Sequence, residues 1–142
     1  MSYDRNNIFA KILRGEIPSF KVYEDDTALA FMDVMPQSNG HTLVIPKSEA
    51  ENFFDVEPKV LSSLIVTTQK IAHAVKNVMN PDGMRIMQFN YPAAGQTVFH
   101  IHLHIIPCYE GVPLKPHTRE MADKNVLAAQ AEKIRAELAK QN

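Results

Sequence analysis

The sequence is poor in cysteine and lacks tryptophan altogether. Its one cysteine, Cys108, has no partner within the chain for a disulfide, and a zinc site built on several thiolates is excluded for the same reason. A single thiol is compatible with a reducing compartment, where disulfides are rare. The fold must therefore be held together by its own packing and hydrogen bonds.

An excess of charge of one sign is also missing. The chain has 15 Lys and Arg residues against 16 Asp and Glu residues, which gives a net charge of −1. Proteins that grip nucleic acid by bulk electrostatics usually carry a strong basic excess. We therefore expect no nucleic-acid partner, although a small anionic ligand held by local dipoles stays compatible with this balance.

Long hydrophobic runs are absent as well. No apolar run reaches the ~18–20 residues that a membrane span needs. The N-terminus, MSYDRNN, is polar and is not followed by the apolar core of a signal peptide. We expect no association with a membrane and a cytoplasmic location.

The residues that are present describe an ordinary globular chain. Hydrophobic residues make up 45% of the 142 positions and charged residues 22%. A chain of this length buries roughly two thirds of its unfolded surface, which is enough for one core. Because no repeat, low-complexity stretch or shift in composition marks a boundary, we expect a single domain over residues 1–142.

Hydrophobic periodicity predicts three helices and five strands. We expect Asp4 to cap the first helix, Asp25-Asp26 to form a turn and Pro46 to end the third strand. In the second helix, Ile65 falls on the apolar face and His73 falls off it. Because strands and helices do not alternate regularly, the expected fold class is α+β, with a mainly antiparallel five-stranded sheet and packed helices. The expected helices are 4–14, 58–79 and 121–140, and the expected strands are 20–24, 27–33, 41–45, 84–89 and 98–106.

The most informative segment is Val98–Ile106, in which apolar residues alternate with histidines. As a strand it would place His100, His102 and His104 on one face, ~6.6 Å apart in succession and ~13 Å between the outer two. Three of the chain's six histidines in one short window are hard to explain as packing. The segment therefore indicates a functional site.

Two kinds of chemistry fit these histidines. A metal site centred on His100 and His102 is one, because a His-x-His pair offers two imidazoles to an ion, but a cysteine pair and an HExxH helix are both missing. Nucleophilic attack on phosphorus is the other. It requires a partner that fixes the tautomer of the attacking imidazole, donors for the phosphoryl oxygens and a proton source for the leaving group.

The loop 90–97, which precedes the histidines, contains candidate helpers for the second chemistry. Gly95 would let the backbone approach a phosphate closely. Gln96 and Thr97 offer side-chain donors directly before the expected strand. Asn90 begins the loop and is included with the candidate catalytic residues.

Three sequence elements resemble the histidine triad (HIT) superfamily. His100-Ile101-His102-Leu103-His104-Ile105-Ile106 matches the family's His-φ-His-φ-His-φ-φ, in which φ is an apolar residue, and Gly95-Gln96-Thr97-Val98 precedes it. Pro36 followed by 40–47 (GHTLVIPK) matches a second element, and Ile8-Phe9, 15–18 (GEIP) and 29–33 (LAFMD) match a third. The resemblance covers about residues 7–107, and its closest likeness is to Hint-like bacterial members.

The resemblance implies a nucleotide hydrolase or transferase that acts at the α-phosphate of nucleoside phosphoramidates or polyphosphates. His102 would be the nucleophile and would form a nucleotidyl-histidine intermediate, from which water releases the nucleoside monophosphate. His104 and Gln96 would contact the phosphoryl oxygens, and Thr97 would lie near the leaving group. Purine nucleotides, of the AMP or GMP type, are favoured by the family.

Further roles follow from the same resemblance. His100 and His41 would orient the central histidines, and Asp33 is similar to the family's ribose-binding acid. The residues that match the base pocket are Ile8, Phe9, Ile12, Phe31, Met32 and Val34, with Gly95 also counted among the nucleotide-binding positions.

The resemblance also implies an assembly and a cofactor requirement. Members are homodimers in which two five-stranded sheets join into ten strands, and their chemistry needs no metal. Some relatives carry zinc on a Cys-x-x-Cys near the first helix, but the corresponding residues here are Asn7 and Ala10, so we expect that zinc site to be absent.

Two departures from the family pattern bear on the substrate. Tyr91 stands where bacterial relatives commonly have Gly, and Cys108 stands where relatives often have Arg. The loss of a cation at Cys108 favours a nucleoside phosphoramidase over a dinucleoside polyphosphate hydrolase. A nucleotidyl transferase and a non-catalytic nucleotide-binding or interaction protein remain as alternatives.

Overall fold

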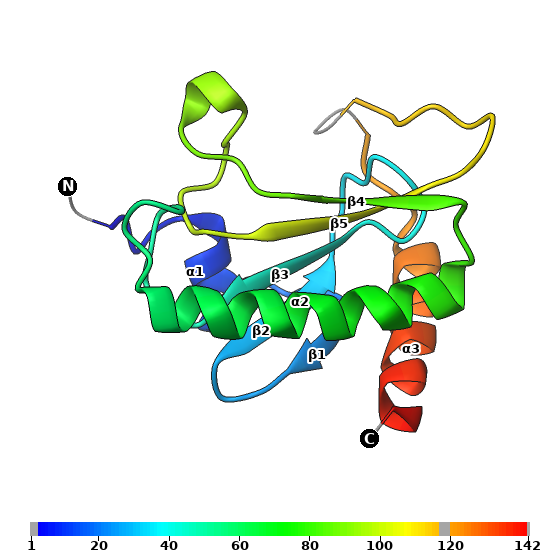
Figure 1. Ribbon diagram of the computed structural model, residues 1–142, viewed down its shortest axis with the longest axis horizontal. Coiled ribbons are helices and arrows are strands. Elements are labelled where there is room, and N and C mark those ends of the chain that lie inside the picture. The colour runs from blue at the N-terminus through cyan, green and yellow to red at the C-terminus, as the bar shows by residue number, and fades with distance from the viewer. Residues whose placement is uncertain (1–2, 117–119, 142) are drawn as a thin grey trace.

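A single antiparallel sheet forms the centre of the protein (Figure 1). The computed structural model describes residues 3–116 and 120–141. The strand order is β1-β2-β3-β5-β4, and every neighbouring pair is antiparallel, which confirms the predicted α+β class and five-stranded sheet. The strands are β1 (Lys21–Glu24), β2 (Ala28–Met32), β3 (Thr42–Pro46), β4 (Gly83–Met87) and β5 (Leu103–Cys108).

Three helices and one short 3-10 turn surround the sheet. They are α1 (Ile8–Leu13), α2 (Pro58–Met79), η1 (Pro92–Ala94) and α3 (Lys124–Lys140). In Figure 1, α2 crosses in front of the sheet, α3 stands at one end, and the loop with η1 projects from the other. Within the described ranges, none of these helices combines the length and apolarity that crossing a membrane requires.

The two faces of the sheet pack against different helices. Because successive residues of a strand point to opposite faces, Ala30 and Met32 of β2 join α2 and α3 in one core cluster, whereas Leu29 and Phe31 join α1 in another. The same alternation continues in β5, where Leu103 and Ile105 face α2. His104 therefore lies on the α1 face, opposite Leu43 of β3.

Several predicted boundaries are wrong by a few residues. The first helix begins at Ile8 because Asn7 is its N-cap, with its side chain accepting from the Ala10 amide at 2.9 Å, while Asp4 accepts from Asn6. The third strand does not stop before Pro46, as predicted, but includes it as its last residue, opposite Ala28. The predicted turn at Asp25-Asp26 is confirmed, since the Asp25 carboxylate accepts from two turn amides.

Helix α2 has the predicted bounds, but one of its residues faces the other way. Ile65 is 48% exposed rather than buried, and it adjoins Val66, which is 65% exposed. Ile86 of the edge strand β4 is exposed too and lines the same shallow hollow as Ile65 and Val66. His73 is exposed, as predicted. An apolar patch therefore lies along α2 and the free edge of the sheet.

Candidate active site

The histidine segment enters the sheet later than predicted. Strand β5 begins at Leu103, so His100 and His102 precede it rather than lying within it. The chain there is fixed by other bonds, because the Ile101 amide donates to the Ala50 carbonyl at 2.9 Å. The uninterrupted strand over 98–106 is therefore wrong, and the three histidines have three different environments.

His100 is a neutral residue of the interior. Its ring is fully buried, and burial lowers its pKa to about 4. Nε2–H donates to the Pro46 carbonyl at 2.8 Å, so Nδ1 carries the lone pair and accepts from the Tyr3 hydroxyl. Burial raises the pKa of Tyr3, so this hydroxyl keeps its proton. Both ring nitrogens of His100 are thus used to hold the chain in place.

His102 has the tautomer that nucleophilic attack requires. Its Nδ1 lies 2.7 Å from the His100 carbonyl oxygen, which can only accept, so Nδ1 carries the proton and Nε2 the lone pair. The ring packs edge-on against Phe9, with 4.9 Å between centroids. His100 was predicted to orient the central histidines. Its backbone carbonyl, rather than its ring, is the group that is positioned to orient His102.

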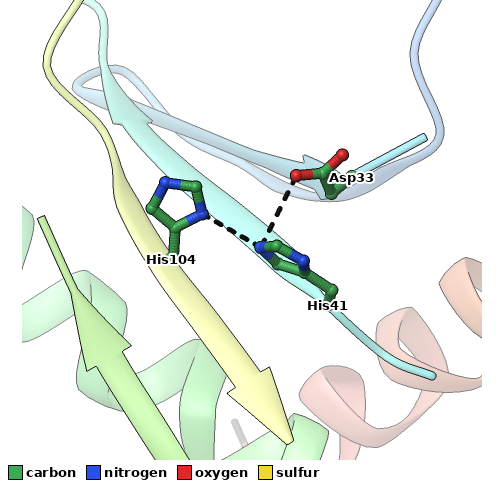
Figure 2. A group of neighbouring side chains, drawn as sticks. All are labelled: Asp33, His41 and His104. Atoms are coloured by element: carbon green, nitrogen blue, oxygen red, sulfur yellow. Dashed lines mark hydrogen bonds and ion pairs between the residues drawn. The ribbon is translucent and has the colours of Figure 1, made fainter. Parts of the chain in front are cut away.

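A second chain of hydrogen bonds sets the tautomers of His41 and His104. The Gln37 amide donates to His41 Nδ1 at 3.0 Å, so the proton of this imidazole lies on Nε2. Nε2 is 2.9 Å from His104 Nδ1, and Figure 2 shows His41 between His104 and Asp33. His104 therefore accepts at Nδ1 and carries its own proton on Nε2.

The two active-site imidazoles are complementary as a result. The rings of His102 and His104 lie 5.0 Å apart between centroids. One presents a lone pair on Nε2 and the other an N–H at the same ring position. A nucleophile and a hydrogen-bond donor side by side suit attack on a phosphorus atom whose oxygens gain negative charge.

Asp33, His41 and His104 resemble a metal-binding cluster only in the distances between their possible ligand atoms. One ligand atom each from Asp33, His41 and His104 lies within 4.8 Å of the others, and His41 Nε2 is 3.5 Å from the Asp33 carboxylate. A metal ion would need the lone pair of His41 Nε2, but the Gln37 amide already requires the lone pair of Nδ1. A neutral imidazole has only one such lone pair. The arrangement therefore fits a hydrogen-bond chain better than a metal site. His100 is equally unsuited to binding a metal ion, because both of its ring nitrogens are already hydrogen-bonded.

His102 and His104 both open onto a pocket of about 550 Å³. It is largely apolar and lies between α1, the sheet and the start of α3. Thr97, His102 and His104 line one part of it. All the residues predicted for the base and ribose also line it, namely Ile8, Phe9, Ile12, Phe31, Met32, Asp33 and Val34.

Other predicted site residues do not line this pocket. They are Asn90, Gly95, Gln96, His41 and His100, none of which belongs to the lining. The Gln96 side chain donates to the Glu51 and Val98 carbonyls at 2.7 and 3.1 Å, and its oxygen accepts from the Tyr91 amide at 2.7 Å. A contact with a phosphoryl oxygen would need exchange of one of these bonds, and it stays a prediction.

Asn90 and Gly95 shape the same loop. The Asn90 side chain accepts from the Phe53 amide at 2.9 Å and so ties the loop to the segment before α2. Gly95 has a φ of +101°, in the left-handed region that favours glycine. Tyr91 has a φ of +71°, which is uncommon for a residue with a side chain. Tyr91, which stands where relatives commonly have Gly, therefore adopts a strained backbone conformation.

Sequence reasoning missed several residues around the pocket. Tyr3 contacts His100 from a distant part of the chain, the Gln37 amide contacts His41 within one loop, and no local pattern marks either residue. The start of α3 was predicted only as a helix, yet it contributes to the pocket wall. The further lining residues from the segments before β1 and around the start of α3 include Ser19, Phe20, Met121, Ala122, Lys124 and Leu127.

Comparisons with known proteins identify the family of this chain. The HIT domain family model matches residues 14–111. "Protein hit" of Bacillus subtilis (strain 168) is 45% identical over 104 residues, which are 73% of this chain and 72% of that protein. The crystal structure of a Hit-like protein involved in cell-cycle regulation from Bartonella henselae, with an unknown ligand, superposes with a TM-score of 0.89 at 51% identity, covering 96% of this chain and 99% of that one.

A plant relative has a named activity. Adenylylsulfatase HINT3 of Arabidopsis thaliana is 39% identical over 100 residues, which are 70% of this chain and 51% of that protein. The family model covers well over half of this chain and places the histidine segment, the loop before it and β1–β5 in one domain family. The chain therefore belongs to the HIT family, whose members are nucleotide-binding hydrolases and transferases.

Proposed function

We propose that this protein hydrolyses nucleoside phosphoramidates, with purine nucleotides favoured, through a nucleotidyl intermediate on His102. The observation that carries the proposal is the 2.7 Å bond from His102 Nδ1 to the His100 carbonyl, because it leaves the lone pair on Nε2. His102 lines the large pocket, so a nucleotide there can bring its α-phosphate to the ring.

In the first step, Nε2 of His102 attacks the α-phosphorus and the P–N bond breaks. The bonding electrons leave with the amine, which takes up a proton from solvent relayed by the Thr97 hydroxyl. Since Nδ1 keeps its proton, the imidazole of the intermediate is cationic, and the His100 carbonyl facing Nδ1 stabilises that charge. His104 Nε2–H donates to a phosphoryl oxygen.

In the second step, water attacks the same phosphorus. The P–Nε2 bond breaks, its electrons return to the imidazole, and the attacking water gives its proton to solvent. The nucleoside monophosphate leaves with its ribose at Asp33 and its base against the apolar wall formed by α1 and β2. No metal ion is needed for either step, because His102 is already a neutral nucleophile and His104 supplies a donor.

Two alternatives differ in the leaving group or in turnover. A dinucleoside polyphosphate hydrolase or a nucleotidyl transferase would use the same His102 chemistry, and the adenylylsulfatase relative has a sulfur-containing leaving group. A non-catalytic nucleotide-binding protein would use the same pocket. A nucleophile with a fixed tautomer favours an enzyme over this last alternative.

We also propose that the protein acts as a homodimer in the cytoplasm. Strand β4 is the edge of the sheet, and exposed Ile65, Val66 and Ile86 form an apolar patch beside it. Pairing of this edge with a second copy would satisfy its open backbone groups and cover the patch. Sedimentation of the wild type against Ile86→Glu tests the assignment, because a charge at the paired edge would shift a dimer toward monomer.

The decisive experiment measures AMP release from adenosine 5′-phosphoramidate. We expect turnover by the wild type and by His73→Ala, which alters an exposed histidine on α2, and none by His102→Ala. Mass spectrometry of acid-quenched wild type should show one adenylyl group on His102. Chelator treatment should leave the rate unchanged. Equal rates in the wild type and His102→Ala would overturn the proposal, and AMP binding without turnover would favour the non-catalytic alternative.

A further inference from the structure

One end of the nucleotide pocket is built by segments that carry none of the histidines. Ser19 and Phe20, which precede β1, line the pocket together with Ala122, Lys124 and Leu127 at the start of α3. Phe20, Ala122 and Leu127 also belong to one hydrophobic cluster, so these two segments meet. The α3 residues lie outside residues 14–111, the part that matches the HIT domain.

The segment before α3 is fixed against the pocket wall rather than lying loosely over it. The Ala122 amide donates to the Val34 carbonyl at 2.9 Å, and Val34 follows Asp33, which also lines the pocket. The Asp123 side chain then caps α3 by accepting from the Asn125 amide at 2.7 Å. Lys124 is thereby held at the first position of the helix and at the rim of the pocket.

The placement of Lys124 has no explanation in helix stability. A cation in the first turn of a helix is on the unfavourable side of the helix dipole, where acidic residues are preferred. The first turn of α3 contains no acidic residue apart from its cap, and no ion pair is recorded for Lys124 within residues 3–116 and 120–141. Lys124 is therefore available to a ligand.

Ser19 supplies a second, independent observation. Its Oγ is buried and has no hydrogen-bond partner among the described residues. Buried hydroxyls are normally bonded, so an unpaired one marks a place where a water molecule or a ligand atom can bind. Because Oγ has no bond to lose, rotation of the side chain toward the pocket breaks no hydrogen bond.

A bound nucleotide would bring its base edge to these two residues. With the phosphate at His102 and the ribose at Asp33, the base would lie against the apolar wall of α1 and β2. Apart from Asp33, Thr97, His102 and His104, the polar residues of the pocket lining are Ser19 and Lys124, so these two are left to meet the base edge. The ammonium of a lysine only donates, and the pocket lining at this end contains no Asn or Gln, the amides that suit adenine. A 6-oxopurine offers two neighbouring acceptors, O6 and N7, whereas adenine places an amino donor beside N7.

We infer that Lys124 and Ser19 read the base edge and make the site selective for 6-oxopurine nucleotides, of the guanine or hypoxanthine type, over adenine nucleotides. The inference rests on the proposed function for the orientation of the nucleotide, because the phosphate must lie at His102. It adds to that function the class of base and two residues that determine it.

The test compares the binding of IMP and AMP by calorimetry, because these ligands differ only at the 6-position and its adjoining ring proton. We expect IMP to bind the wild type about tenfold more tightly, as a charged donor on one base edge typically provides. Lys124→Met keeps the length of the side chain and removes the charge, and it should bring the two Kd values together. Lys133→Met makes the same change on an exposed part of α3 outside the pocket and should keep the preference.

Ser19→Ala should weaken IMP binding about threefold while changing AMP binding less, since it removes a single neutral hydroxyl. Equal affinity of the wild type for IMP and AMP, or an unchanged ratio in Lys124→Met, would overturn the inference. The binding assay needs no turnover. If both nucleotides bind equally and the phosphoramidate is hydrolysed, only the base assignment fails; if neither nucleotide binds, the proposed function fails with it.

Discussion

The two faces of the sheet differ in what their side chains do, although the same strands form both. On the face toward α2 and α3, residues such as Ile71, Ile105 and Ile134 are fully buried and apolar. On the face toward α1, buried His41, His104 and Asp33 adjoin a pocket of about 550 Å³. One face is mainly filled to stabilise the fold, although Met32 and Leu127 of its cluster also reach the pocket, and the other face adjoins the catalytic side of that pocket.

The difference shows how a small domain can bury several polar groups without losing its core. The polar face satisfies its groups in pairs and chains, as from the Gln37 amide through His41 to His104. Each of these bonds also fixes a tautomer. The bonds that compensate for burial are therefore the bonds that prepare the chemistry.

After the loss of the nucleophile in His102→Ala, the largest effect on the polar face should come from His104→Ala. This change removes the Nε2–H donor and leaves the apolar face intact. We expect kcat to fall about 10²–10³-fold, the usual cost of one donor to a developing oxyanion. Steady-state hydrolysis of adenosine 5′-phosphoramidate measures this, with the Kd of the product nucleotide as a check that the pocket remains formed. A kcat within threefold of the wild type would contradict the assignment of His104.

The neighbouring residue sharpens the comparison, because Ile105 points to the opposite face. Ile105→Ala removes buried methyl groups from the core beneath α2, and we expect the free energy of unfolding to fall by about 2–5 kcal/mol. Urea denaturation measures this loss. The kcat of the folded protein should stay near the wild-type value. A large fall in kcat would show that the two faces are not separable in function.

A third prediction concerns pH and the deeply buried His100. Burial lowers its pKa to about 4 in the folded protein, against about 6.5 in an unfolded chain. Between these values the unfolded chain binds the proton and the folded one does not, so stability is lost as pH falls from about 6.5 toward 4. The full loss from this group is of the order of 3 kcal/mol.

An NMR titration of the histidine ring protons checks this directly. We expect the His100 signals to stay unchanged down to about pH 5, well below the value of about 6.5 of an unperturbed histidine. Urea unfolding at pH 7 and pH 5 should show the matching loss of stability. A midpoint for His100 near 6.5, the ordinary value of a histidine, would contradict the burial and the bonds assigned to its ring.

Hydrophobic patterns in the sequence predicted the fold class, whereas the apolar residues of the pocket were predicted from the resemblance to the HIT family. Alternation placed Leu103, His104 and Ile105 on their correct faces, and the apolar residues of the first helix line the pocket as expected. The strand was nevertheless extended too far. Alternation alone cannot show that the His100 ring bonds to Pro46 and that Ile101 bonds to Ala50, which takes this segment out of the sheet.

The residues that fix the site from a distance left no local signal. Tyr3 bonds to His100, which lies 97 residues further along the chain, and the Gln37 contact with His41 is made by a backbone amide, which every residue except proline has. No local sequence pattern marks Lys124 as a residue of the pocket either. Such contacts depend on tertiary placement, and only the structure reveals them.

The smallest effect should come from Tyr3→Phe, which keeps the ring that packs edge-on against His100 and removes only the hydroxyl. The buried Nδ1 of His100 then loses its donor, at a cost of about 1–3 kcal/mol in stability. His100 also positions the carbonyl that holds His102, so Tyr3 acts through His100 as a positioning residue. We expect kcat to fall several-fold with little change in KM, and ¹⁵N NMR should show a weakened His102 Nδ1–H bond.

Tyr109→Phe is the matched control, because the Tyr109 hydroxyl donates to the Asn39 carbonyl at 2.8 Å, away from the pocket lining. It should change neither kcat nor the His102 signal. If Tyr3→Phe lowered stability but left kcat and the His102 Nδ1–H signal as in Tyr109→Phe, Tyr3 would be a structural contact alone. If both measurements change only in Tyr3→Phe, the polar face extends beyond the sheet to the N-terminal segment, which then shares in orienting the nucleophile.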